Sequence, residues 1–188
     1  MSELNLFRNY AQLIIGAENC LAQNLAVPAL VLIYTAIDTV SWIASADENQ
    51  PVGKRFQIWV DKWMLQKYPL PCTAEELYAA RCGLLHTLTP HSNLNQKKGV
   101  RRVAYAFGKA RQKDLEDSIK ILEYPGLVAM HVDDIFSSFR NGFVDFLEML
   151  ENDPTEKKLF AEKANKHFSI MEISTIDEFL ASAKKSGR

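Results

Sequence analysis

The feature that most constrains the fold is an apolar run over residues 25–46. Apart from Tyr34, a few hydroxyl side chains and Asp38, this run holds only apolar residues. A helix that is apolar on nearly all sides lies in the centre of a bundle or crosses a membrane. Asp38 sits near its middle, where a carboxylate costs about 2.5–3.5 kcal/mol on insertion scales, and no Lys or Arg closely flanks either end. We therefore expect a central core helix beginning at Val27 or Pro28, and no membrane span.

Further helices are expected around this core. Apolar residues at three- and four-residue spacing predict helices over about 3–23, 54–65 and 132–152. Thr73 followed three residues later by Glu76 is a capping box, which predicts a helix over about 74–88, ended by Pro90. Weaker patterns predict short strands at 100–107 and 169–173, and surface helices at 114–123, 155–168 and 175–184.

Together these elements predict a mostly α-helical fold, a bundle of about five to seven helices with at most one short two-stranded β element. With 47% hydrophobic and 24% charged residues, the chain has an ordinary globular composition. We expect residues 1–188 to form one domain, with residues 155–188 as a peripheral C-terminal extension. Three cysteines without a CxxC pair, and no signal peptide, favour a reducing, cytoplasmic location.

The helix at 74–88 has two faces that could be buried. At 100° per residue, one sector holds a leucine-rich set together with Arg81, and the opposite side holds small residues and His86. Gly83 costs about 1 kcal/mol of helix propensity relative to alanine. A glycine is nevertheless useful where another backbone approaches the helix closely. We therefore predict a homodimer interface on the face of Ala79, Cys82, Gly83 and His86.

The segment from Arg81 to His86, late in a helix of an α-bundle, resembles the R-x4-6-H motif of the HEPN superfamily. The resemblance covers about residues 3–90. It implies a usually dimeric helical domain, and many such domains are metal-independent endoribonucleases in toxin, abortive-infection and RNA-processing systems. Arg81 and His86 would then be catalytic, and an antitoxin or other partner protein could bind. Family nucleases usually carry a polar residue directly after the arginine, where this chain has Cys82, so the alternative is a non-catalytic helical dimer module that binds a partner protein or nucleotide.

The chemistry of such a site needs a proton acceptor, a proton donor and stabilisation of negative charge. Histidine, with an ordinary pKa of about 6.5, can take either proton role, and arginine offers a fork of donors to phosphate oxygens. Residues five apart on a helix point about 140° from each other and lie about 7.5 Å apart along its axis. We therefore expect a second protomer to complete the cleft. Asp38 is predicted to orient Arg81 through a buried ion pair, and Cys82 to have an orienting or structural role.

A basic segment follows the motif. Residues 97–113 hold seven basic side chains and no acid, and the other 15 basic residues face 23 acidic ones, so the remainder carries a net charge of −8. We predict RNA binding by Lys97, Lys98, Arg101 and Arg102, with Tyr105 and Phe107 interleaved as in surfaces that bind single strands. A solvated strand and helix face is the alternative. Cys82, His86 and His91 lack a clear fourth ligand for zinc, so no metal and no other cofactor is expected.

Overall fold

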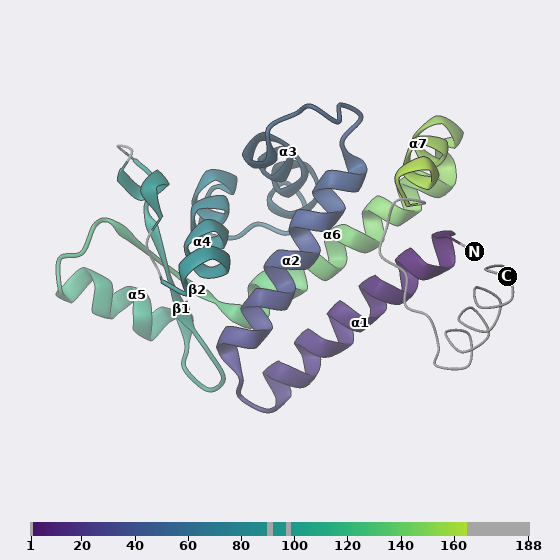
Figure 1. Cartoon of the computed structure of the whole chain (residues 1–188). Helices are drawn as coiled ribbons and strands as arrows, with labels where there is room; N and C mark the ends of the chain where they lie inside the picture. The colour runs from purple at the N-terminus through teal and green to yellow at the C-terminus, as the bar shows by residue number, and fades with distance from the viewer. Residues whose placement is uncertain (1, 90–91, 97–98, 165–188) are drawn as a thin grey trace, which may run out of the picture.

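A computed structural model of the chain describes residues 2–89, 92–96 and 99–164. Within these ranges lie seven α-helices, a π-helix, a 3₁₀-helix and two strands (Figure 1). In chain order the elements are α1 Ser2–Ala22, α2 Ala26–Ala44, α3 Val52–Trp59, η1 (π) Val60–Leu65, α4 Ala74–Thr87, η2 (3₁₀) Asn93–Gln96, β1 Arg102–Ala106, α5 Gln112–Ile121, β2 Leu127–His131, α6 Val132–Asn152 and α7 Pro154–Ala164. The expected mostly α-helical bundle with a short two-stranded element is confirmed.

The apolar helix α2 lies in the middle of the bundle, as predicted. Side chains along most of its length are buried, among them Ile33, Tyr34, Ile37 and Val40. The long helix α1 runs beside it, and α3, α6 and α7 also pack against it (Figure 1). Among the described helices, α2 is also the one whose length and composition would suffice to cross a membrane. Half of its most apolar 18-residue stretch is buried within the fold.

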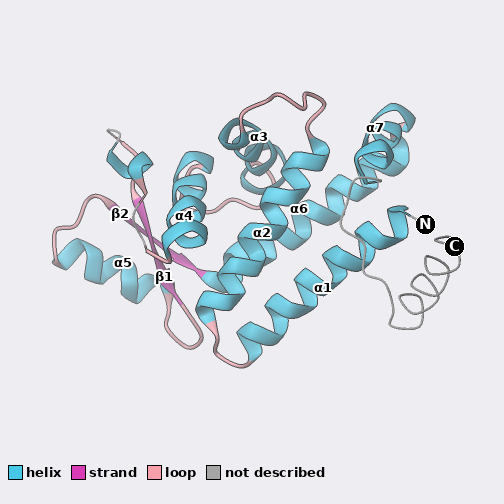
Figure 2. Cartoon of the chain, in the orientation of Figure 1, coloured by secondary structure: helices cyan, strands magenta, loops and turns pink. Residues whose placement is uncertain are grey.

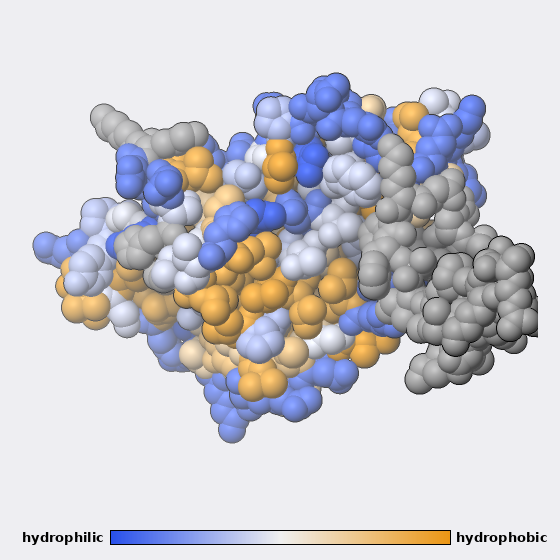
Figure 3. Space-filling model, viewed as in Figure 1, coloured by the Kyte–Doolittle hydropathy of each residue, from blue (hydrophilic) through white to orange (hydrophobic). Residues whose placement is uncertain are grey.

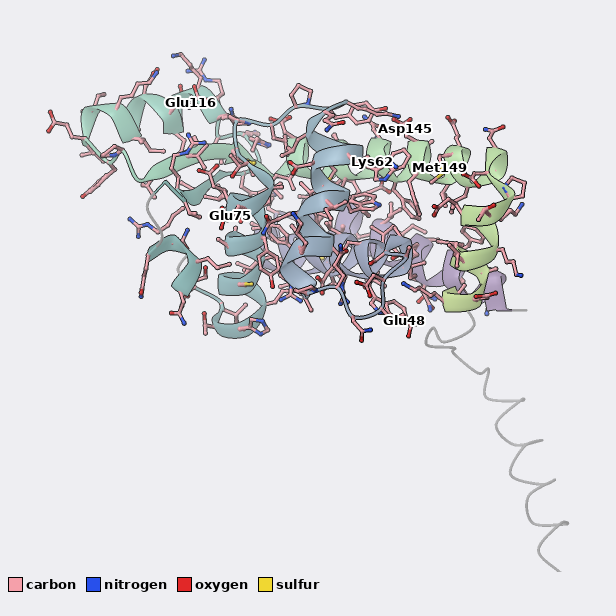
Figure 4. The ribbon with its side chains drawn as sticks, turned by 90° about the horizontal axis from the view of Figure 1, so that it is seen from above. Glu48, Lys62, Glu75, Glu116, Asp145 and Met149 are labelled. Carbon is pink, nitrogen blue, oxygen red and sulfur yellow. The ribbon has the colours of Figure 1, made fainter. Side chains whose placement is uncertain are left out.

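Aromatic side chains join α6 to the α3–η1 helix. The rings of Phe139 and Phe146 lie 6.0 and 6.4 Å from that of Trp59, and the Phe146 ring is 5.5 Å from that of Trp63. A Cβ at Gly142 would collide with the Trp63 carbonyl group, so only glycine allows η1 to come this close to α6. From above, the labelled side chains of Lys62, Asp145 and Met149 gather where these helices cross, far from Glu116 on α5 (Figure 4).

The two strands form a parallel pair joined by α5. Val103 is opposite Val128, Tyr105 is opposite Met130, and both valines and Met130 are buried. The pair lies between α5 and α4 (Figure 2). The strand predicted at 100–107 is thus confirmed as β1, whereas its partner β2 was not predicted. The strand expected at 169–173 and the helix expected at 175–184 lie outside the described residues.

Helix α7, within the segment expected to be a peripheral surface helix, packs on the bundle through one face. Phe160 is 5% exposed, and its ring lies 5.9 Å from that of Phe146. The buried Lys163 ammonium donates to the carbonyl oxygens of Trp42 and Ser45, where α2 ends. A cation at the carbonyl end of a helix also interacts favourably with the helix dipole. One face of α7, with Phe160, Lys163 and Ala164, therefore packs on the core, while most of its other residues are exposed. Residues 165–188 lie outside the described part.

Candidate functional site

Three side chains meet between α2 and α4. The Arg81 Nη2 donates to Asp38 Oδ2 at 2.6 Å, and the Arg81 Nη1 lies 3.2 Å from His86 Nε2. The side chains of Arg81 and Asp38 are 13% and 22% exposed, whereas His86 is exposed. The predicted ion pair between Asp38 and Arg81 is confirmed, and it holds the guanidinium beside an accessible imidazole.

Local structure explains where these side chains lie. The Thr73–Glu76 capping box is formed in full at the start of α4, as predicted, and Leu77 and Leu84 anchor the helix in the core. The helix ends at Leu88, which has a left-handed φ of 51°, so His86 lies in the last turn.

The chemistry of arginine sets the direction of the contact between Arg81 and His86. Arginine has only donors, so His86 Nε2 is the acceptor in this contact. The two side chains meet within one chain, although their positions on the helix point about 140° apart. The long arginine side chain reaches along the helix to the histidine. A second protomer that completes the cleft stays a prediction.

Cys82 supports the same cluster. Burial lowers the pKa of the Arg81 guanidinium. Asp38 and a hydrogen bond with Cys82 raise this pKa by more than burial lowers it, so the net pKa lies above its ordinary value. Burial raises the pKa of the Tyr78 hydroxyl, and its hydrogen bond with Cys82 adds to that rise. The orienting or structural role of Cys82 stays a prediction.

An open hollow of about 410 Å³ adjoins the cluster. Its walls come from the outer side of α4 and from the segment that begins η2. The lining side chains are Tyr78, Cys82, His86, Thr87, Ser92, Asn93 and Leu94. A ligand in this hollow would touch the imidazole of His86 directly.

The predicted dimer face needs correction. Ala79 and Gly83 are buried within the chain's own fold, so a second copy has no access to them. Cys82 is half-buried and His86 is exposed. The small residues of α4 therefore allow close packing inside one protomer and do not form a contact between two.

Arg101, which was predicted to bind RNA, has a structural role in the fold. Its Nε and Nη2 donate to Glu76 Oε1 and Oε2 at 2.6 and 3.0 Å, and its backbone N–H donates to Oε1 at 3.1 Å. Glu76 is 1% exposed, so Arg101 neutralises a buried carboxylate. Of the other predicted RNA-binding residues, Arg102 is half-buried at the start of β1, and Lys97 and Lys98 lie outside the described residues.

The rest of the basic segment also turns inward or pairs with acids. The Tyr105 hydroxyl lies 2.9 Å from that of Tyr34, and burial raises the pKa of Tyr105 well above its ordinary value. Phe107 packs against the core. Arg111 pairs with Asp114, and Lys113 pairs with Asp117. Tyr105 is half-buried and held by Tyr34. Of the alternative, a solvated strand and helix face, the helix part fits α5, which has no buried residue, whereas β1 is half-buried or buried.

Comparisons with family models, with curated proteins and with solved structures find no match for the chain. Across the described ranges, no three His, Cys, Asp or Glu side chains gather in an arrangement that could hold a metal ion. The site is therefore defined by its own geometry, and Asp38, Arg81 and His86 are its central residues.

We expect Asp38→Ala to lower the free energy of unfolding by about 3 kcal/mol, the lower end of the range for breaking a buried ion pair. The change leaves the guanidinium of Arg81 largely buried without its carboxylate. The melting temperature measured by circular dichroism tests this, with His86→Ala as control, because an exposed side chain contributes little to stability. Equal, small shifts for both variants would contradict a stabilising role for this pair.

Proposed function

We propose that the protein cleaves single-stranded RNA without a metal ion, at the site formed by Arg81 and His86. The observation that carries the proposal is the guanidinium held by Asp38, with its other Nη 3.2 Å from an exposed imidazole. A phosphate that enters beside Arg81 would then lie within reach of His86. The resemblance of this segment to the HEPN motif supports the same assignment.

The reaction needs one proton acceptor and one anion-stabilising group. The entering phosphate takes the place of His86 at Arg81 Nη1. The freed His86 Nε2 then takes the proton of the 2′-hydroxyl, whose oxygen bonds to the adjacent phosphorus. Arg81 stabilises the additional negative charge through its forked donors. The bond from phosphorus to the 5′ oxygen breaks, and the imidazolium of His86 returns the proton to that oxygen. The products are a 2′,3′-cyclic phosphate and a 5′-hydroxyl end.

We expect purified protein to cut single-stranded RNA in the presence of EDTA and to leave 2′,3′-cyclic phosphate ends or their hydrolysed form. A DNA strand of the same sequence should stay intact, because it lacks the nucleophile. Gel electrophoresis of end-labelled strands and mass spectrometry of the fragments measure both. Cleavage of the DNA strand, or dependence on added metal, would contradict the mechanism.

A second candidate function is favoured by Cys82 and by exposed apolar side chains beside the site. Leu88, two residues after His86, is 68% exposed, and it lines a second hollow with Val27, which is 50% exposed. Figure 3 shows a broad apolar area on the face in view. In this alternative a helical dimer module binds a partner protein or nucleotide and cuts nothing. Cys82→Asn restores the polar neighbour that family nucleases favour. If neither wild type nor Cys82→Asn cuts RNA, while light scattering gives twice the chain mass for both, the binding module replaces the nuclease.

A further inference from the structure

The hollow beside His86 is not used by the proton transfers themselves. It measures about 410 Å³, within the range of about 300–1,000 Å³ common for sites that bind small ligands. Tyr78 and Leu94 give it apolar walls, and the side chains of Ser92 and Asn93 add polar groups. An apolar hollow with a few polar groups suits a flat heteroaromatic ligand.

The aromatic wall is held in place by α3. The ring of Tyr78 lies 5.4 Å from that of Phe56, at an angle of 51°. A Cβ at Gly53 would come within 2.6 Å of Tyr78 Cε1, so glycine at this position gives the ring its room. Tyr78 therefore has a defined position, and an aromatic ring in a defined position can stack with an unpaired base at little entropic cost.

The polar wall is a preformed turn. Asn95 Oδ1 accepts from both the backbone N–H and the hydroxyl of Ser92, and the backbone N–H of Leu94 donates to Ser92 Oγ. Asn93 is exposed on this turn, and its side chain makes no hydrogen bond within the described ranges. A side-chain amide offers both donors and an acceptor, as the edge of a nucleobase requires.

We propose that this hollow is a nucleobase subsite, which takes one unstacked base of single-stranded RNA with its adjoining phosphate at Arg81 and His86. The inference rests on the proposed function for the position of the phosphate. In this subsite Asn93 forms hydrogen bonds with the edge of the base, and the ring of Tyr78 stacks on the base. The protein should then prefer some bases next to the cut and should bind nucleoside 3′-monophosphates unequally.

The test is a titration of wild-type protein with each of the four nucleoside 3′-monophosphates, followed by NMR. We expect at least one nucleotide to shift the resonances of Tyr78 and Leu94. Asn93→Ala should weaken binding of that nucleotide about tenfold, which is within the range expected for the loss of one hydrogen bond to the base. Leu94→Trp, which fills the hollow, should abolish it. The matched control is Gln96→Ala, an exposed side chain of the same 3₁₀-helix outside the hollow, which should leave binding unchanged.

The outcomes separate this inference from the proposed function. Binding that is weakened in Asn93→Ala and lost in Leu94→Trp, in a protein that cuts no RNA, supports the subsite and removes the nuclease. Cleavage with the same base preference in wild type, Asn93→Ala and Leu94→Trp keeps the nuclease and overturns the subsite. Absence of nucleotide binding by wild type also overturns the subsite.

Discussion

Replacing Arg101 with alanine is expected to lower the free energy of unfolding by about 3 kcal/mol, the lower end of the range for stranding a buried charge. The side chain of Glu76 is only 2% exposed, and it would lose the guanidinium that neutralises it. We expect a loss at the lower end of this range because the backbone N–H groups of Thr73 and residue 101 would still donate to the Glu76 carboxylate. Urea unfolding followed by circular dichroism measures the change.

A surface ion pair in the same part of the chain provides the control. Arg111 and Asp114 form a close contact at 2.6 Å, but their side chains are 78% and 56% exposed. Exposed pairs contribute only about 0–1 kcal/mol, so Arg111→Ala should change stability little. If Arg101→Ala were as mild as Arg111→Ala, the contact with Glu76 would not be a major source of stability.

The same ion pair predicts a dependence of stability on pH. Burial raises the pKa of Glu76, but hydrogen bonds from Arg101 and from the Thr73 backbone lower it more, so the net pKa lies below the ordinary 4.5. A carboxyl with a lowered folded-state pKa stabilises the fold above its unfolded-state pKa, and this contribution is lost as pH falls through the folded-state pKa. The advantage of wild type over Glu76→Gln should thus be complete above pH 4.5 and shrink below it. A constant difference from pH 7 to pH 3 would contradict this.

Local signals were sufficient to predict most helices. The capping box of Thr73 and Glu76 and the periodic phenylalanines of α6 depend on residues close in sequence, and both predictions are confirmed. The strand β2 was missed because its five residues run directly into α6, and its pairing depends on β1, 25 positions earlier. No local pattern in Leu127–His131 marks such a distant partner.

Side-chain partners were harder to predict than helices. The Asp38–Arg81 pair could be predicted, because Asp38 is the single charged residue of an apolar helix and needs a cation nearby. Arg101 looked like one member of a basic run, and nothing close in sequence pointed to Glu76 as its partner. A helical projection showed Ala79 and Gly83 as a separate small face, but it could not tell whether that face meets the same chain or a second one.

His86→Ala is expected to lower kcat/KM for RNA by about 10²–10⁴-fold, because it removes a positioned proton-transfer group. The fold should be unchanged, since the side chain is exposed. Arg81→Lys should also lose most of the activity, because an ammonium cannot reproduce the planar fork that contacts Asp38 and His86 together. Arg140→Lys is a matched control, as Arg140 lies on α6 in an exposed pair with Glu18.

The double variant decides whether the two residues act as one unit. If Arg81 positions the phosphate on which His86 acts, removing either group disables the same step. The combination of Arg81→Lys with His86→Ala should then be barely less active than His86→Ala alone, as is general for residues that act together. Two independent effects would instead multiply, and the double variant would fall by the product of the single losses. If the losses of kcat/KM in the single variants multiply in the double variant, the contact between Arg81 and His86 has no part in catalysis, even if both residues contribute to catalysis.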